Sequence, residues 1–415
     1  MADFMQNGVI TTLHKLTDRP TEDLEAELTQ FARRAPLALI LPSLYSELEG
    51  PALSGIIDHL AEVPYIDEIV IGLDRADEAQ YRYAQAFFGR LPQNHTILWN
   101  DGPRLRALDA ELEAEGLAPL QPGKGRNAWY CLGYTLARGR AHAVALHDCD
   151  IVTYTRDLPA RLFYPVANPG FEFSFCKGYY ARVAEGKLNG RVTRLFLTPM
   201  IRALKRILGP LDYLEFLDSF RYPLSGEFAM RTDEIKNMRI PSDWGLEVGI
   251  LSEVYRNLSP RQVCQVDIAD QYDHKHQPLS VEEQDTGLSR MSREIAKSIY
   301  RKLSTEGVVL TNEFFRTIKA TYLRMALDML QQYAHDATIN GLKLDCHAEE
   351  QAIETFTQSI IAAGEDFLAN PMEVPFIPSW NRIHSAIPDF AKRLIQAVEE
   401  DNANGDSPKT PVAVA

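Results

Sequence analysis

Two aspartates, one residue apart, form the part of this sequence best suited to binding a metal ion. Asp148 and Asp150 flank Cys149 and follow the apolar run 143–146. Because both carboxylates lie just past a predicted buried strand, they can reach one divalent cation. Their oxygens suit Mg²⁺ or Mn²⁺, which take their other ligands from water and phosphates. The pair could therefore hold the diphosphate of a nucleotide-sugar, although Asp-x-Asp also occurs by chance in solvated turns.

Two glycine-containing segments add positive charge. Residues 123–125 (Gly-Lys-Gly) stand ahead of a predicted helix, whose N-terminus favours anions, so Lys124 could contact a diphosphate. The segment is not a P-loop, because the required spacing and the following Ser or Thr are absent. In residues 190–193 (Gly-Arg-Val-Thr) a guanidinium, a hydroxyl and backbone N–H groups could hold a phosphate or a carboxylate. Each segment could also be an exposed, solvated turn.

Two glutamates and a histidine are further candidates. Glu227 and Glu247 each lie in an apolar stretch that contains glycine. Since burying a glutamate without a partner is costly, each should form hydrogen bonds, either at a site or in a structural salt bridge. His274 follows Tyr272 in a polar run. A neutral imidazole is a good third ligand for a metal that carboxylates already hold, although this run could also be a solvated surface.

Apolar runs that alternate with helical patterns must position these groups. The runs predict strands at 37–41, 69–73, 96–99 and 143–147, and the helical patterns predict helices at 21–34, capped by Thr21, 52–62 and 127–139. This alternation predicts an α/β fold with a mostly parallel sheet. Ligands gather at the carboxyl ends of such strands, so Pro42, Asp74 and Asp148 could line one pocket.

The pattern changes along the second half of the chain. Residues 171–176 alternate apolar and polar side chains and predict another strand, whereas helical spacing prevails from about residue 284. These helices are expected to serve core packing or a dimer surface. We therefore expect an N-terminal helical segment over 1–35, an α/β domain over 36–283 with halves at 36–150 and 151–283, a helical region over 284–400 and a disordered tail over 401–415.

The bulk composition excludes several classes of protein. The 415 residues carry a net charge of −14, which disfavours binding to nucleic acid or to an anionic membrane surface. The five cysteines are scattered without any Cys-x-x-Cys, so we expect neither a zinc site nor a disulfide framework. The sequence shows no signal peptide and no apolar run long enough to span a membrane. A cytoplasmic enzyme is the expectation.

Taken in order, these motifs resemble those of the retaining GT-A glycosyltransferases of the glucosyl-3-phosphoglycerate synthase family. The resemblance covers roughly residues 35–282. It rests on Leu41-Pro42-Ser43-Leu44, Gly123-Lys124-Gly125, Asp148-Cys149-Asp150, Gly190-Arg191-Val192-Thr193, Pro223-Leu224-Ser225-Gly226-Glu227, Gly245-Leu246-Glu247-Val248-Gly249, and His274 shortly before Pro278-Leu279.

The resemblance implies a Rossmann-like GT-A domain that binds a nucleotide-sugar, with a mostly helical C-terminal region. The donor would be UDP-glucose, the acceptor 3-phospho-D-glycerate and the cofactor Mg²⁺ or Mn²⁺; the product would serve compatible-solute synthesis. We expect a homodimer. The implied nucleotide-binding residues are Pro42, Ser43, Asp74, Lys124, Asp148 and Cys149; the metal ligands are Asp148, Asp150 and His274; the acceptor-binding residues are Gly190, Arg191, Val192, Thr193, Glu247 and Tyr272; and Asp150, Arg191 and Glu247 are the catalytic set.

The implied chemistry needs no protein nucleophile. In retaining members the acceptor attacks from the front face, and the donor phosphate accepts the proton of the acceptor hydroxyl. The metal, Lys124 and nearby backbone dipoles would stabilise charge on the departing nucleoside diphosphate.

One departure from the family pattern keeps other functions open. The family usually has a basic residue two positions before the metal histidine, where this chain has Tyr272, and the stretch between Gln265 and His274 is one residue longer. A glucosyl or mannosyl transferase acting on glycerate or another small hydroxy-acid is therefore an alternative. A sugar nucleotidyltransferase is a second, but no glycine- and arginine-rich triphosphate loop follows the first strand. A non-catalytic nucleotide-sugar binder is disfavoured by the aspartate pair and His274.

Overall fold

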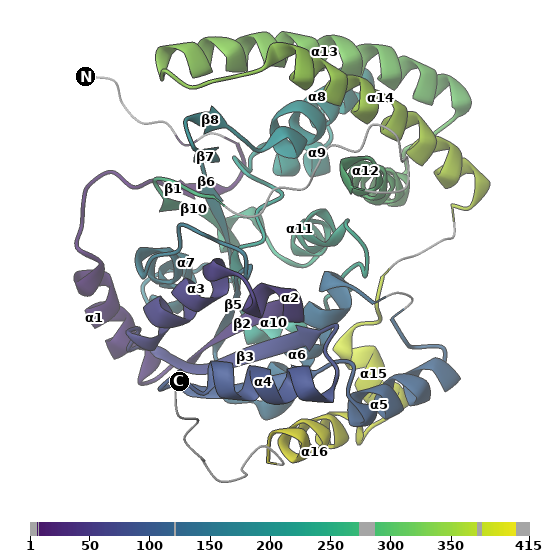
Figure 1. Ribbon diagram of the computed structural model, residues 1–415. Helices are drawn as coiled ribbons and strands as arrows, with labels where there is room; N and C mark the ends of the chain where they lie inside the picture. The colour runs from purple at the N-terminus through teal and green to yellow at the C-terminus, as the bar shows by residue number, and fades with distance from the viewer. Residues whose placement is uncertain (1–5, 7, 120–121, 274–286, 372–375, 404–415) are drawn as a thin grey trace.

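A mostly parallel sheet forms the centre of the protein (Figure 1). The computed structural model describes residues 6, 8–119, 122–273, 287–371 and 376–403. Within them, eight strands form one sheet, in the order β1 (Thr11–Leu13), β10 (Val263–Ala269), β6 (Phe175–Tyr180), β9 (Phe228–Arg231), β5 (Ala143–Leu146), β2 (Leu37–Leu44), β3 (Ile66–Asp74) and β4 (Asn94–Trp99). Strand β9 is antiparallel to both its neighbours, and the other pairs are parallel. The predicted α/β fold class is confirmed.

Helices cover both faces of the sheet, so that each face has its own apolar core. In β2, Leu39 and Leu41 pack in one core with helices α1, α3 and α7, and Ile40 packs in the other with α6, α8 and α11. Burial on both faces explains the continuous apolar run of this strand. The helices before residue 284 are α1 (Thr21–Ala32), α2 (Tyr45–Leu48), α3 (Pro51–Ala61), α4 (Glu78–Phe88), α5 (Pro103–Ala114), α6 (Lys124–Arg138), α7 (Asp157–Ala167), α8 (Thr198–Leu208), α9 (Asp212–Asp218), α10 (Thr232–Ile235) and α11 (Leu246–Asn257).

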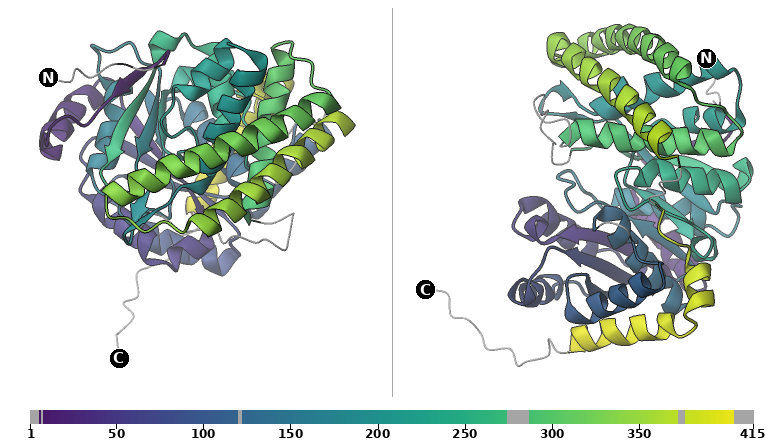
Figure 2. Two further views of the ribbon diagram at one scale, coloured as in Figure 1. Left: turned by 90° about the horizontal axis from the view of Figure 1, so that it is seen from above. Right: turned by 90° about the vertical axis from the view of Figure 1, so that its right-hand side faces the viewer.

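The helices after residue 284 form two groups at opposite ends of the molecule (Figures 1 and 2), and residues of both groups pack in the core that contains Ile40. Helices α12 (Gly287–Thr305), α13 (Asn312–Ile339) and α14 (Cys346–Ala369) pack together, and α13 also packs on α8. At the other end, α16 (Phe390–Ala403) follows α15 (Trp380–Ala386) and packs on α5, α6 and β4. Both groups share apolar cores with the sheet, and the predicted domain boundaries stay predictions. No helix in the described ranges is both long and apolar enough to cross a membrane.

Several elements differ from the sequence prediction. Strand β2 does not stop at Pro42 but continues to Leu44. Beyond Ile40 it pairs with β3 and no longer with β5, so one side of the strand is an edge where proline is tolerated. Residues 171–174 are not a strand; the strand begins at Phe175.

The two ends of the chain also differ from the prediction. Thr21 is the first residue of α1 and not its cap. Its hydroxyl donates to the carboxylate of Asp157 at 3.3 Å. The segment 1–35, expected to be helical, also contributes β1 to the sheet. The expected tail begins too early, because residues 401–403 still belong to α16, and the remainder of the expected tail lies outside the described residues.

The sheet topology brings the sequence motifs to one edge. Strands β2, β3, β5 and β6 are oriented so that their carboxyl ends meet there. Because β9 runs the opposite way, its first residue lies at that same edge, where Phe228 pairs with Leu146. The residues that follow β5 and those that precede β9 therefore converge, and this convergence places Asp148 beside Gly226.

Candidate active site

Asp148 lies at the centre of the converging segments. Its Oδ1 atom is 2.6 Å from Nζ of Lys124, which comes from the first turn of α6. A Cβ atom on Gly226 would lie only 2.3 Å from Oδ2 of Asp148, so glycine is required for this approach. The Pro-Leu-Ser-Gly-Glu motif thus has a steric reason for its glycine.

The contact predicts the effect of a Gly226→Ala substitution. The added methyl group would displace the Asp148 carboxylate, and misplacing a reacting group by about 1 Å costs roughly 100-fold in rate. We therefore expect kcat to fall about 100-fold while the thermal unfolding midpoint stays within a few degrees of wild type. The matched control is Gly55→Ala on α3, where a Cβ meets nothing within 4 Å. Equal rates in the two variants would show that the Asp148 position is not critical.

Lys124 joins Asp148 to Glu247 of α11, whose Oε1 atom lies 3.1 Å from the ammonium group. Burial alone would lower the pKa of Lys124, but Asp148 and then Glu247 oppose it and the pKa is raised overall. The lysine is therefore a permanent cation at physiological pH. It can stabilise negative charge on a departing phosphate group.

Two glycines bring α6 and α11 together around Pro241. A Cβ on Gly125 would meet the carbonyl oxygen of Pro241 at 2.1 Å, and a Cβ on Gly249 would meet its ring at 2.2 Å. Both helices thus approach the same proline more closely than any side chain would allow. This packing explains the glycines that accompany Lys124 and Glu247 in their motifs.

Glu227 is fully buried and has the hydrogen-bonding role expected of it. Its carboxylate accepts bonds from Tyr180 at 3.0 Å, Tyr272 at 2.7 Å and Ser225 at 2.9 Å. Burial, and then the negative charge of Asp148, raise the pKa of Glu227. The rings of Tyr180 and Tyr272 stack with their centroids 3.5 Å apart.

The structure shows two buried residues of this network that sequence reasoning missed. Lys177 lies in β6 and donates to the carbonyl of Ser225 at 2.5 Å; burial lowers its pKa to about 8. Tyr180 ends the same strand. A lysine inside an otherwise apolar, fully buried strand was the signal that could have revealed this network.

The predicted metal ligands are described only in part. Asp148 and Asp150 flank Cys149, which is buried, and burial raises the pKa of its thiol so that the side chain stays neutral. The backbone N–H of Val152 donates to Asp273 at 2.8 Å, so the segment before His274 lies beside the aspartate pair. His274 itself lies outside the described residues. Within the described ranges, no three His, Cys, Asp or Glu side chains could hold a metal together. Two carboxylates alone fit a cation that completes its shell with phosphate and water.

A cavity of about 520 Å³ opens beside Lys124, Asp148 and Glu247. Its wall also includes the predicted acceptor loop Gly190, Arg191, Val192 and Thr193, together with Tyr180, Arg182, Tyr222 and Trp244, with Lys343 of the turn between α13 and α14, and with Glu349 of α14. The predicted acceptor loop and the predicted diphosphate site thus share one cavity. Tyr272 is not part of this wall; its buried ring stacks on that of Tyr180, which is.

Arg191 is held by a residue that the sequence did not single out. The buried carboxylate of Glu349, in the first turn of α14, lies 2.5 Å from Nε of Arg191 and 2.9 Å from the guanidinium of Arg194. Gly190 has a φ of 79°, a conformation that favours glycine, and leads into the π-helix Val192–Leu197. One carboxylate facing two guanidinium groups leaves a positive charge at this wall.

A second cavity of about 660 Å³ adjoins the ends of β2 and β3. Asp74 lines it and accepts a hydrogen bond from Asn100 at 2.7 Å; burial raises the pKa of Asp74, and Asn100 and Asn127 oppose the shift. Ser43 is buried and its hydroxyl donates to the Leu44 carbonyl at 3.0 Å. Pro42, the residue before it, is half-buried within β2.

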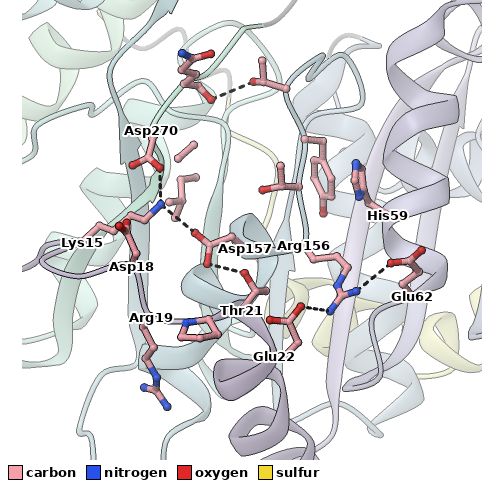
Figure 3. Close-up of a pocket in the computed structure, with 17 residues that line it drawn as sticks. Lys15, Asp18, Arg19, Thr21, Glu22, His59, Glu62, Arg156, Asp157 and Asp270 are labelled. Carbon is pink, nitrogen blue, oxygen red and sulfur yellow. Dashed lines mark hydrogen bonds and ion pairs between the residues drawn. The ribbon is translucent and has the colours of Figure 1, made fainter.

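A third cavity, of about 850 Å³, is lined by other residues (Figure 3). Lys15 lies between Asp157 at 3.8 Å and Asp270 at 2.5 Å. Arg156 contacts Glu22 and Glu62 as well as Glu25. Since carboxylates already neutralise these cations, the wall offers no obvious place for a diphosphate.

Comparison with known proteins identifies the relatives of this chain. No protein-family model matches the sequence. The glucosyl-3-phosphoglycerate synthase of Persephonella marina is 48% identical over 404 residues, which cover 97% of this chain and 100% of the relative. The enzyme of the same name from Methanococcoides burtonii is 38% identical over 405 residues, covering 96% of this chain and 98% of the relative.

A solved structure supports the fold independently. The crystal structure of glucosyl-3-phosphoglycerate synthase from Mycobacterium tuberculosis in complex with Mn²⁺, UDP-glucose and phosphoglyceric acid superposes with a TM-score of 0.52 at 20% identity. The match covers 71% of this chain and 88% of that one. This likeness confirms the predicted GT-A fold. With the identity and coverage of the two relatives, the chain belongs to the glucosyl-3-phosphoglycerate synthase family.

Proposed function

We propose that the protein transfers glucose from UDP-glucose to 3-phospho-D-glycerate with retention of configuration, giving glucosyl-3-phosphoglycerate for compatible-solute synthesis. One observation carries the proposal. A single cavity of about 520 Å³ is bounded by the cation–carboxylate cluster of Lys124, Asp148 and Glu247 and by the loop 190–193. A diphosphate leaving group and an anionic acceptor can therefore meet there.

The aspartate pair suits a divalent cation, for which Mg²⁺ and Mn²⁺ are the candidates. Asp148 and Asp150 would hold it, with His274 as the third protein ligand. When bound, such an ion neutralises charge on the diphosphate. Crystal structures of the Mycobacterium tuberculosis enzyme in complex with UDP and either Mg²⁺ or Mn²⁺ agree with this assignment.

The described residues themselves supply the remaining electrostatics. Lys124 adds a fixed positive charge next to Asp148. Gly226 lets the carboxylate of Asp148 approach, and buried Glu227 holds the ring of Tyr272 beneath that of Tyr180. Glu247 faces the cavity and would orient a hydroxyl of the hexose or of the acceptor. No protein nucleophile is needed for a front-face reaction.

Arg191 is proposed to bind an anionic group of the acceptor, and Arg191→Ala tests that role. A hydrogen-bonded charge is worth about 1.5–3 kcal/mol, so we expect the acceptor KM to rise roughly 10- to 100-fold. The KM for UDP-glucose should be unchanged, because the loop lines the acceptor side of the cavity. A selective loss of donor binding would place the acceptor pocket elsewhere.

Two expectations about the whole molecule belong to the proposal. A cytoplasmic location agrees with the thiols of Cys131, Cys149, Cys176, Cys264 and Cys346, which are all free. A homodimer stays an expectation from the helical sequence pattern. Size-exclusion chromatography with light scattering would test it.

The function is tested by measuring nucleoside diphosphate release from UDP-glucose and GDP-mannose, with 3-phosphoglycerate and D-glycerate offered in parallel. The proposal expects rapid release with UDP-glucose and 3-phosphoglycerate. Turnover with glycerate alone would favour the related hexosyltransferase, for which Tyr272 in place of a basic residue is the supporting feature. Turnover with GDP-mannose and not with UDP-glucose would show that the donor is a mannosyl nucleotide.

A further inference from the structure

The charges on the wall of the 520 Å³ cavity are not balanced. The cations on this wall are Lys124, Arg182, Lys187, Arg191 and Lys343, and the carboxylates are Asp148, Glu247, Asp345 and Glu349. Lys124 pairs with Asp148 and Glu247, and Arg191 pairs with Glu349. Asp345 caps α14 by accepting from the N–H of Ala348 at 3.1 Å. Lys187 lies 3.8 Å from a carboxylate oxygen of Glu185, so the positive charge that remains belongs to Arg182 and Lys343.

Arg182 is the more buried of these two cations. Its Nε atom is buried and has no hydrogen-bond partner among the residues described, and no carboxylate pairs with its guanidinium within those ranges. Burial would lower the pKa of Arg182, and the phenol of Tyr222 raises it overall. A partly buried guanidinium without a counter-ion is unfavourable, so an anionic ligand would stabilise it.

The position of Arg182 suits a role in acceptor binding. Its carbonyl accepts from the N–H of Asn189 at 2.7 Å, which closes the β-hairpin of Val183–Ala184 and Lys187–Leu188. A Cβ atom on Gly190 would lie 3.6 Å from the Cβ and Cδ atoms of Arg182. The side chain therefore packs directly on the first residue of the predicted acceptor loop.

Lys343 approaches the same region from the turn between α13 and α14. Its backbone N–H donates to Gly186 at 2.8 Å, at the tip of the hairpin, and it forms an isolated parallel bridge with Lys187. Its ammonium group forms no ion pair within the described ranges. The turn thus closes the cavity with a cation that comes from outside the segment 35–282.

We propose that Arg182 and Lys343 form a second anion subsite, which binds one of the two anionic groups of the acceptor while the loop 190–193 binds the other. This inference rests on the proposed function, because 3-phosphoglycerate carries both a phosphate and a carboxylate. It assigns the α13–α14 turn a part in substrate selection. The family usually has a basic residue where this chain has Tyr272. Arg182, before the β-hairpin, and Lys343, in the α13–α14 turn, would then supply the positive charge that this position lacks.

The test measures KM for both substrates in Arg182→Gln, Arg182→Lys and Lys343→Met. A lost charged hydrogen bond raises KM for 3-phosphoglycerate about 10- to 100-fold in Arg182→Gln and several-fold in Lys343→Met. KM for UDP-glucose should stay constant, and Arg182→Lys should recover part of the loss. Arg202→Gln and Lys319→Met are matched controls, since both residues are exposed and neither lines the cavity.

Competitive inhibition then shows which anionic group the subsite binds. If it binds the phosphate, Arg182→Gln raises the inhibition constant of glycerol 3-phosphate and leaves that of D-glycerate unchanged. If it binds the carboxylate, Arg182→Gln raises the inhibition constant of D-glycerate and leaves that of glycerol 3-phosphate unchanged. An unchanged KM for 3-phosphoglycerate in folded Arg182→Gln overturns the subsite while the proposed function stands. A wild-type enzyme that does not use 3-phosphoglycerate overturns the proposed function itself.

Discussion

Replacing Asp150 with alanine is expected to remove most metal-dependent turnover. The carboxylate follows β5 at the edge where Asp148, Lys124 and Gly226 converge, and a divalent cation there would lose one of its few protein ligands. We expect kcat to fall about 1,000-fold at saturating UDP-glucose. Nucleoside diphosphate release over a range of Mg²⁺ and Mn²⁺ concentrations measures this loss.

The same experiment includes His274→Ala, because the sequence motifs predict that imidazole as a ligand of the same ion. Both variants should keep the wild-type unfolding midpoint without metal and lose the stabilisation that metal with UDP provides. Asp58→Ala, on the exposed face of α3, is the control for a lost surface carboxylate. A rate near that of wild type in Asp150→Ala or His274→Ala would contradict its assignment as a metal ligand.

Replacing Lys124 with methionine is expected to reduce kcat about 100- to 1,000-fold, which is the usual cost of removing one charge-stabilising donor. Methionine keeps most of the side-chain volume but leaves Asp148 and Glu247 without the cation that lies 2.6 and 3.1 Å from them. The uncompensated carboxylates should also weaken binding of the nucleotide diphosphate. Steady-state kinetics with UDP-glucose as the varied substrate separates the two effects.

Lys392→Met is the matched control for Lys124→Met, because Lys392 is exposed on α16 and lines neither the 520 Å³ nor the 660 Å³ cavity. Thermal unfolding checks that Lys124→Met is folded. A folded Lys124→Met enzyme with an unchanged kcat would mean that the lysine only supports the packing of α6 against α11.

The sequence predicts the parts of this fold whose burial is complete. Strand β3 and helix α3 appear close to where their apolar patterns placed them, because both lie against the sheet core. The position of Asp148 follows from the same logic, since the strand before it is buried on both faces. The sequence predicted strand β2 too short, because a proline such as Pro42 usually ends a strand. Beyond Ile40 the strand no longer pairs with β5, which is why it can contain a proline, but nothing in the sequence indicates this loss of a neighbour.

The residues that sequence reasoning missed act through long-range contacts. Glu349 lies 158 positions from Arg191 in the sequence. Lys343 lies in the turn between two helices whose sequence pattern indicates only core packing. Arg182 lacks a glycine or a repeated motif beside it. Strand β9 is antiparallel to β5, and the direction of a strand in the sheet depends on how the chain connects it, which the local sequence pattern does not indicate. Each of these depends on topology rather than on spacing.

The central claim is transfer of glucose to 3-phosphoglycerate with retention. Proton NMR of a reaction containing UDP-glucose, 3-phosphoglycerate and Mg²⁺ tests it most directly, because the anomeric signal reports both the new bond and its configuration. We expect an α-linked glucosyl product that accumulates in step with UDP. A β-linked product, or free glucose as the only new sugar, would contradict it.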